Sequence, residues 1–469
     1  MRMLRSLLGL SCALAACSGS TNDDGSDDDV ILGRDGGSSV VTPRDAGADR
    51  DASTNPPLTS MRVLLGTRDM LGRAAPLDVG RRFVGDREAA TPFTIRNESP
   101  NMLTLNASTP VSLAGDSGEF LVTNPASTTL GPGEATTFTV EFAPTRPGPA
   151  QVDVRVHHAD GAIGASAFTM RGYGHATGGQ PLYLGGGGAY YRLRTPSGEP
   201  NTWEQQTDRL DTSLCDGLGP DHPRDLIRGF GYGDGTFVVA GGSCDGMLGM
   251  TRDGVNWTTQ ILGMPYAGFY QDVAWQEGLF VAVGGLGGRA YSNDRAASWV
   301  VTGDYSKCQL RRVAAGNGRF VAVGNLFDRG CITTTTDGET WTPITDEPDL
   351  LDSVAFGNGV FVAIGPTRCQ WSEDGLTWNT CTGQVQSTRK VFFANGEFLV
   401  FGPEGVSRSV DGNAWTTAPG PWLEGVAYGQ GRYVGVAVQM RGYGTTVEGM
   451  TLENVPSDVA EWHFGYVYP

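Results

Sequence analysis

Five aspartates recur in one short pattern, and repeated carboxylates of this kind could act as acids, as bases or as cation ligands. Four copies have the form Ser/Thr-x-Asp-Gly-x-x-Trp and contain Asp253 with Trp257, Asp337 with Trp341, Asp374 with Trp378, and Asp411 with Trp415. A fifth copy, SNDRAASW, contains Asp294 and Trp299. An aspartate at the start of a tight turn accepts hydrogen bonds from the backbone N–H groups that follow it. We interpret the repeated aspartates as structural.

Other residues that could carry chemistry are scattered along the chain. The sequence has no C-x-x-C and no H-E-x-x-H, and its five histidines lack the spacing of metal ligands. Asp221 and His222 are adjacent and could supply an acid or a base, but no nucleophile motif accompanies them. We expect no catalytic residue, no metal and no cofactor.

The elements that position these aspartates recur with a period near forty. Apolar runs such as FVVAGG (237–242), FVAVG (320–324) and FVAIG (361–365) each follow a small turn such as GNG (316–318) and precede an Asp-Gly turn. Four short strands per unit of this length are typical of a β-propeller blade. Tryptophans at 203, 257, 299, 341, 378, 415 and 462 indicate about seven four-stranded blades in residues 177–469, with six or eight left open.

The repeated pattern resembles the Asp-box, or BNR repeat, of sialidases, sortilin-type propellers and photosystem assembly factors. Their usual form is S-x-D-x-G-x-x-W, and four copies here are one residue shorter. The resemblance implies that the boxes lie on outer hairpins, away from the face that binds ligands. We expect each tryptophan to be buried against a neighbour, so Trp378→Ala should cost roughly 3–5 kcal/mol through lost burial and a cavity. The Arg-Ile-Pro motif of sialidases is absent, so a glycoside hydrolase is the lesser alternative. The arginines that could serve such an enzyme are scattered along the sequence: Arg192, Arg228, Arg289 and Arg368.

The N-terminal region predicts a signal peptide followed by a tether. Residues 1–16 have a basic start, an apolar run and small residues, and the run ends in LAAC, which resembles the lipobox of bacterial lipoproteins. The resemblance implies lipidation of Cys17, and Ser18 after it favours the outer membrane. Residues 17–58 are rich in Asp, Gly and Ser and lack aromatic residues, which predicts a disordered acidic tether.

Residues 59–176 have the alternation of half-buried antiparallel strands. FTIRN (93–97), FTVEF (138–142) and VDVRV (152–156) alternate apolar and polar positions between Gly/Pro turns. The segment resembles the Hydin-type, PapD-like immunoglobulin domains of bacterial surface lipoproteins in its Pro-Gly, its F-A-P and its closing Gly-Tyr-Gly. The expected fold class is therefore all-β, with an immunoglobulin-like sandwich followed by the propeller.

Six cysteines fall in the repeats, an even number that favours disulfides in an exported chain. Their places in the blades suggest three pairs: Cys215 with Cys244, Cys308 with Cys331, and Cys369 with Cys381. The connections between blades and the loops between second and third strands share one face, which is the usual binding face of a propeller. Our candidate ligand residues there are Asp221, His222, Arg224, Tyr305 and Arg329.

Charge and anchoring restrict the function. A net charge of −17 without a basic stripe argues against nucleic acid as a partner. We expect a monomeric, non-catalytic lipoprotein of the cell envelope whose propeller face binds a protein or glycan at the cell surface. A periplasm-facing assembly factor for an envelope complex is the alternative.

Overall fold

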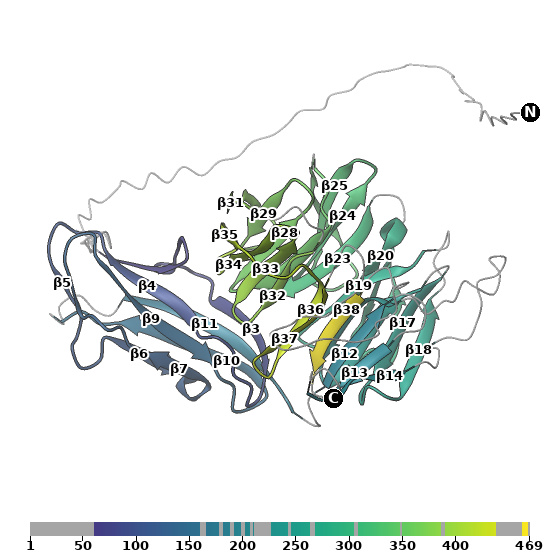
Figure 1. Cartoon of the computed structure of the whole chain (residues 1–469), viewed down its shortest axis with the longest axis horizontal. Helices are drawn as coiled ribbons and strands as arrows, with labels where there is room; N and C mark the ends of the chain where they lie inside the picture. The colour runs from purple at the N-terminus through teal and green to yellow at the C-terminus, as the bar shows by residue number, and fades with distance from the viewer. Residues whose placement is uncertain are drawn as a thin grey trace, which may run out of the picture. The chain divides into compact units, whose positions relative to one another are not determined.

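The computed structural model describes residues 61–159, 166–177, 182–187, 192–197, 202–206, 210, 227–242, 245–262, 268–303, 308–347, 349–385, 390–437 and 462–467. All of these residues fall in the compact unit formed by residues 55–469. The fold is all-β (Figure 1). Among the described residues, no helix has the length and apolar character needed to cross a membrane. The predicted signal peptide, Cys17 and the tether lie outside the described residues.

Residues 61–175 form a sandwich of two sheets around one core. One sheet has the strand order β2-β1-β4-β9-β7 and the other has the order β3-β11-β10-β6, with β3 parallel to β11. Apolar side chains alternate inward along the strands, as at Phe93 and Ile95 of β4 and Phe138 and Val140 of β9, all of which are buried. The two phenylalanine rings stack with their centroids 5.2 Å apart. The predicted alternation therefore corresponds to the observed core.

The elements of the sandwich, with the short pair β5 and β8 and the 3-10 turn η1, are β1 Met61–Leu65, β2 Arg68–Asp69, β3 Leu77–Phe83, β4 Thr91–Asn97, β5 Leu103–Thr104, β6 Val111–Gly115, η1 Ser117–Glu119, β7 Phe120–Thr123, β8 Thr129–Leu130, β9 Ala135–Phe142, β10 Gly148–Val156 and β11 Ser166–His175.

The repeat region, residues 177–469, is a succession of antiparallel sheets, and four of them have four strands in chain order. These four are β15 Ile227–Gly233, β16 Thr236–Gly241, β17 Gly246–Thr251 and β18 Trp257–Leu262; β19 Tyr270–Gln276, β20 Leu279–Gly284, β21 Arg289–Ser292 and β22 Val300–Val301; β23 Gln309–Gly316, β24 Arg319–Leu326, β25 Arg329–Thr335 and β26 Thr342–Glu347; and β27 Ser353–Gly357, β28 Val360–Ile364, β29 Cys369–Ser372 and β30 Asn379–Thr380. The 3-10 turn η3, Gly285–Gly287, follows β20.

The remaining sheets depart from chain order at their edges. The next sheet has the order β31-β35-β34-β33-β32, with β31 Thr382–Gly383, β32 Phe392–Ala394, β33 Glu397–Gly402, β34 Gly405–Ser409 and β35 Ala414–Ala418; β36 Leu423–Gly429 then pairs with β37 Arg432–Ala437. The first sheet is completed by the end of the chain in the order β14-β13-β12-β38, with β12 Leu182–Gly187, β13 Arg192–Thr195, β14 Glu204–Gln206 and β38 Trp462–Val467.

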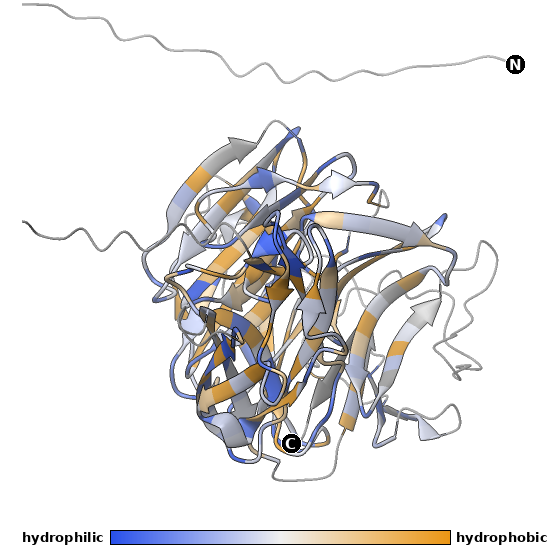
Figure 2. Ribbon diagram, turned by 90° about the vertical axis from the view of Figure 1, so that its left-hand side faces the viewer, coloured by the Kyte–Doolittle hydropathy of each residue, from blue (hydrophilic) through white to orange (hydrophobic). Residues whose placement is uncertain are grey.

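The first strands of successive sheets contact one another. β15 contacts β19, β19 contacts β23, β23 contacts β27, β27 contacts β32, and β32 contacts β36. β38 contacts both β36 and β15. The second strands are buried along their length, as in β16 and β28. Figure 2 shows the hydrophobic residues concentrated along the strands.

The described residues contain two disulfides, and both are pairs that the repeat positions predict. Cys308 precedes β23 and is bonded to Cys331 of β25, while Cys369 of β29 is bonded to Cys381, which follows β30. Cys215 and Cys244 lie outside the described residues.

Candidate functional site: two faces of the repeat region

The five Asp turns, residues 251–257, 292–299, 335–341, 372–378 and 409–415, share one hydrogen-bond pattern. In the turn of Asp374, the carboxylate accepts the N–H groups of Leu376 (2.8 Å) and Thr377 (2.7 Å). The Ser372 hydroxyl donates to the same carboxylate (3.0 Å) and accepts the Gly375 N–H (2.9 Å). Each turn is thus closed by its own aspartate.

These bonds hold the aspartates ionised. Burial opposes ionisation at Asp253, but hydrogen bonds from the Asn256 side chain and from following N–H groups lower its pKa to about 2. The pKa of Asp294 is lowered chiefly by Ser298, and that of Asp337 chiefly by the Thr340 N–H. A carboxylate with a lowered pKa is a poor proton donor near neutral pH. The arrangement fits a structural role.

The glycine of each turn packs against the preceding sheet. Gly375 has φ +70°, and a Cβ there would lie 2.7 Å from Val321 Cγ2 of β24. Gly412 has φ +74°, and a Cβ there would lie 2.6 Å from Val362 Cγ2 of β28. In the fifth copy Ala296 takes this role with φ +63°, buried among residues that include Val238 and Leu248. The extra residue of that copy therefore lengthens the turn without removing the contact.

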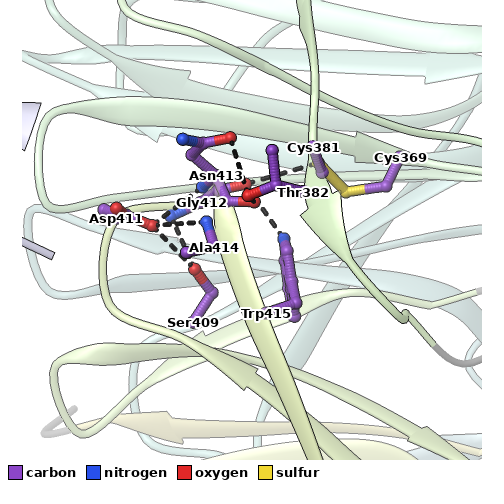
Figure 3. The surroundings of a disulfide bond; sticks show 9 residues. All are labelled: Cys369, Cys381, Thr382, Ser409, Asp411, Gly412, Asn413, Ala414 and Trp415. Carbon is purple, nitrogen blue, oxygen red and sulfur yellow. Dashed lines mark hydrogen bonds between the residues drawn. A yellow bond between two sulfur atoms is a disulfide. The ribbon is translucent and has the colours of Figure 1, made fainter. Parts of the chain in front are cut away.

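The tryptophans of the Asp turns are not equally buried, which corrects our expectation for Trp378. Trp415 is buried and packs beside Phe398. Its Nε1 donates a hydrogen bond to the Gly412 carbonyl (3.0 Å), which Figure 3 shows. Trp378, like Trp257, Trp299 and Trp341, is only half-buried. The full cost of deleting a buried tryptophan is therefore expected at Trp415.

Asp411 differs from the other turn aspartates because it also binds the sandwich. Its Oδ2 accepts the Thr67 N–H and the Thr67 hydroxyl, both at 2.7 Å, and its Oδ1 accepts bonds from Ser409, Asn413 and Ala414. The side chain is fully buried. Burial raises its pKa, but the bonds from Thr67 and from its own turn prevail and leave the pKa below the usual value.

Asparagines in the turns between first and second strands connect each sheet to the next. Asn358 donates from Nδ2 to the carbonyls of Gly396 and Val410, both at 2.8 Å. Asn317 makes the equivalent bonds to Gly359 and Glu373 one sheet earlier. The turns between first and second strands and the Asp turns therefore share one face, which we call the turn face. From the sequence alone these asparagines are turn formers, and their recurrence in G-N-G is the signal that points to a shared role.

The sandwich contacts the turn face at several sheets. Arg68 is buried and donates to the Asn358 carbonyl (2.8 Å) and to Glu373 (3.2 Å), and Arg73 also pairs with Glu373. The Ala89 N–H donates to Asn395. An aromatic cluster completes the contact, formed by Phe83, Tyr173, His175, Tyr232 and Trp275. Burial lowers the pKa of His175 to about 3, so this histidine is neutral at physiological pH.

The opposite face, which we call the loop face, carries the loops between second and third strands and the connections between sheets. Of the predicted ligand residues, Asp221, His222, Arg224 and Tyr305 lie outside the described residues. Arg329 is exposed at the start of β25, next to the hairpin tip at Phe327. Phe327 is 93% exposed with φ +56°. Phe327 is not among the residues predicted from the sequence, because an aromatic residue in a loop carries no periodic signal.

A cavity of about 640 Å³ lies on the loop face between the β27–β30 sheet and the next one. Its lining includes Arg368, Asp349, Gln384 and Glu404. Arg368 is paired with Asp349 at 3.1 Å. The Cys369–Cys381 disulfide forms part of the wall of this groove.

The disulfide and the neighbouring Asp turn hold one side of this groove. The Cys381 N–H donates to the Cys369 carbonyl (3.0 Å). The Thr382 N–H donates to Asn413 O (2.7 Å), so the connection runs along the Asp turn of the next sheet, as Figure 3 shows. We call this cavity the loop-face groove.

The arginines considered for a hydrolase lie with separate partners. Arg192 stacks over Trp257, Arg289 over Trp341 and Arg228 over Phe269, at 4.0 to 5.5 Å from the ring centroids. Arg368 lines the groove. No group of three or more metal-ligating side chains occurs in the described part of the chain.

Comparison with known proteins identifies the sandwich. Residues 74–173 match the family model of the HYDIN/CFA65/VesB-like, Ig-like domain. The sandwich is thus similar to the Ig-like domains of this family. A search of curated proteins finds no match.

Solved structures resemble a larger part of the chain. A nidogen/laminin complex is 12% identical, covering 61% of this chain and 98% of that chain, with a TM-score of 0.37. YCF48 bound to D1 peptide is 16% identical over 55% and 88%, with a TM-score of 0.38. The computationally designed protein Ika8 is 10% identical over 77% and 96%, with a TM-score of 0.36.

Proposed function

We propose that the repeat region is an Asp-box β-propeller of seven blades, and that its loop face binds a protein or glycan ligand. The protein would be a monomeric lipoprotein, anchored through Cys17 to the outer membrane and exposed at the cell surface. The blade assignment is supported by the successive contacts of the first strands and by β38, which contacts both β36 and β15. The Asp turns support it further, because each packs on the preceding sheet.

The observation that carries the choice of face is the contact of the sandwich with the turn face. Polar groups of the turn face are bound by hydrogen bonds and ion pairs from the sandwich residues Thr67, Arg68 and Arg73. The loop face, in contrast, has an open groove lined by polar residues. Polar loops that are crosslinked by a disulfide and held on a rigid scaffold are typical of ligand-binding surfaces. A non-catalytic role is supported by the separate placement of Arg192, Arg228, Arg289 and Arg368.

Binding is tested with purified residues 59–469 on glycan arrays and on extracts of neighbouring cells. We expect Arg368→Ala and Glu404→Ala to weaken binding of the ligand found by about tenfold or more, because each removes a charged partner in the groove. Arg252→Ala, at an exposed position of an Asp turn, is the matched control and should bind like the wild type. Unchanged binding in both groove variants would contradict the assignment of the site.

Location is tested by protease accessibility on intact cells of the native host. Cleavage within residues 17–58 without lysis is the expected result. Complete protection until the outer membrane is opened would contradict surface display and support the periplasm-facing assembly factor.

A further inference from the structure

A cavity of about 230 Å³ lies between the sheet that contains β32–β35 and the β36–β37 pair. It is lined mainly by apolar side chains, among them Leu399 and Phe401 of β33, Val406 of β34 and Tyr433 of β37, and we call it the β37 cavity. It shares no described lining residue with the loop-face groove, so the two are separate features of the fold.

The apolar wall of the β37 cavity has an equivalent two sheets earlier. In the same order, the wall is Leu399, Phe401 and Val406 here and Val321, Val323 and Ile332 there. In both sheets the second residue of the set pairs with the third across the hairpin, and the first directly follows a buried phenylalanine. In the earlier sheet an Asp turn covers this wall, because Trp378 packs against it and a Cβ on Gly375 would lie 2.7 Å from Val321 Cγ2.

The aromatic side of the β37 cavity also matches the described turns. A Cβ on Gly375 would lie 3.5 Å from Phe361 Cε2 of its own sheet, and a Cβ on Gly412 would lie 3.6 Å from Phe398 Cε2. Each phenylalanine is the second residue after the glycine that ends the turn between first and second strands, and Tyr433 has the same position. The β37 cavity thus has both walls that a turn glycine contacts elsewhere.

A segment with the pattern of an Asp turn follows β37 in the sequence. Residues 438–461 connect β37 to β38 and lie outside the described residues. They include TVEGMTL, residues 446–452. This stretch is Ser/Thr-x-Asp-Gly-x-x-Trp with glutamate in place of the aspartate and leucine in place of the tryptophan. The sequence therefore offers one further copy of the turn.

The position of this copy agrees with the repeat. The relevant spacing runs from the aromatic residue of the second strand to the glycine of the Asp turn. It ranges from 14 positions for Phe361 and Gly375 to 18 positions for Phe320 and Gly338. Gly449 follows Tyr433 by 16 positions, which lies within this range.

We propose that residues 446–452 form an altered Asp turn that docks in the β37 cavity, with Gly449 against Leu399 and Leu452 in the place of the tryptophan. Glycine permits the positive φ that Gly375 and Gly412 have at this position. Burial of a leucine against the apolar wall stabilises the docking. The inference rests on the repeat architecture within the proposed function, and it uses no property of the ligand.

Thermal unfolding of the purified protein tests the contact by a double-mutant cycle. Gly449→Val should lower the melting temperature by about 3 °C or more, because the new side chain meets Leu399 and is held at a strained φ. Leu399→Ala removes the obstructing atoms, so in that background Gly449→Val should lower the melting temperature by about half as much or less. If Gly449→Val does not fold, Gly449→Ala replaces it in the same cycle, since it adds the Cβ alone.

Two cycles in the described sheets are the matched controls. Val362→Ala should relieve the effect of Gly412→Val in the same way, because an added Cβ on Gly412 would lie 2.6 Å from Val362 Cγ2. Leu399→Ala should not relieve the effect of Gly375→Val, whose side chain faces a different sheet, so these two losses should add.

An unchanged melting temperature in Gly449→Val, or equal losses from it in the two Leu399 backgrounds, would overturn the proposal. Light scattering detects an alternative occupant. A dimer that dissociates in Leu399→Ala, together with additive losses, would assign the cavity to a second copy of the chain instead. None of these measurements uses a ligand, so loop-face binding can fail while the coupling holds, and the coupling can fail while a ligand is found.

Discussion

Replacing Asp411 with alanine should lower the free energy of unfolding by more than about 3 kcal/mol, and Asp374→Ala should lower it by about 1 kcal/mol. Asp411 is fully buried and accepts five hydrogen bonds, two of them from Thr67 of the sandwich. Its removal leaves these donors without an acceptor. Asp374 closes the same kind of turn in an exposed position. Urea denaturation of both variants measures the difference.

The pH dependence separates the loss of the carboxylate from a general loss of packing. The lowered pKa of Asp411 means that its contribution is present above the unfolded value of 3.8 and is lost as the pH falls below it. The gap between wild type and Asp411→Ala should therefore narrow in acid. Equal costs for the two aspartates at neutral pH would contradict the role of Asp411 in docking the sandwich.

Trp415→Ala should cost roughly 3–5 kcal/mol, which is the range for deleting a buried large side chain. Trp415 is 5% exposed, packs with Phe398 and Val360, and bonds to the Gly412 carbonyl. Thermal and urea unfolding of the purified variant measure the loss.

Trp378→Ala is the internal control for Trp415, because the two residues end equivalent Asp turns. Trp378 is half-buried, so its deletion removes less contact and should cost clearly less. An equal or larger loss at Trp378 would show that burial does not decide the effect.

Sequence patterns predicted the strands well because apolar runs and turn residues report burial directly. FVAIG predicts a buried strand, and β28 is buried throughout. In the sandwich, the alternation of FTIRN matches the inward and outward side chains of β4. The disulfide pairs Cys308–Cys331 and Cys369–Cys381 followed from their places in the repeat.

The contacts that define the two faces could not be predicted in this way. Asn317 and Asn358 bind carbonyls of the next sheet, and a backbone carbonyl has no sequence signature. The docking of Thr67 on Asp411 joins residues far apart in the chain whose types are common in any turn. The bulge before Asp272 depends on how two strands pair rather than on composition. These features arise from tertiary structure, where local patterns carry little information.

The pairing of β12 with β38 has a consequence for how the chain folds. These strands come from the two ends of the repeat region. Their pairing therefore requires the closure of a very long loop, and the entropy cost of this closure comes before any stabilising contact between the strands forms. Until β38 arrives, β12 presents an open strand edge, which is a template for association with other chains. During synthesis the β12 edge therefore stays unpaired until β38 is available to pair with it. Protection from aggregation is needed until that moment, and a chain truncated before Trp462 stays permanently at this vulnerable stage.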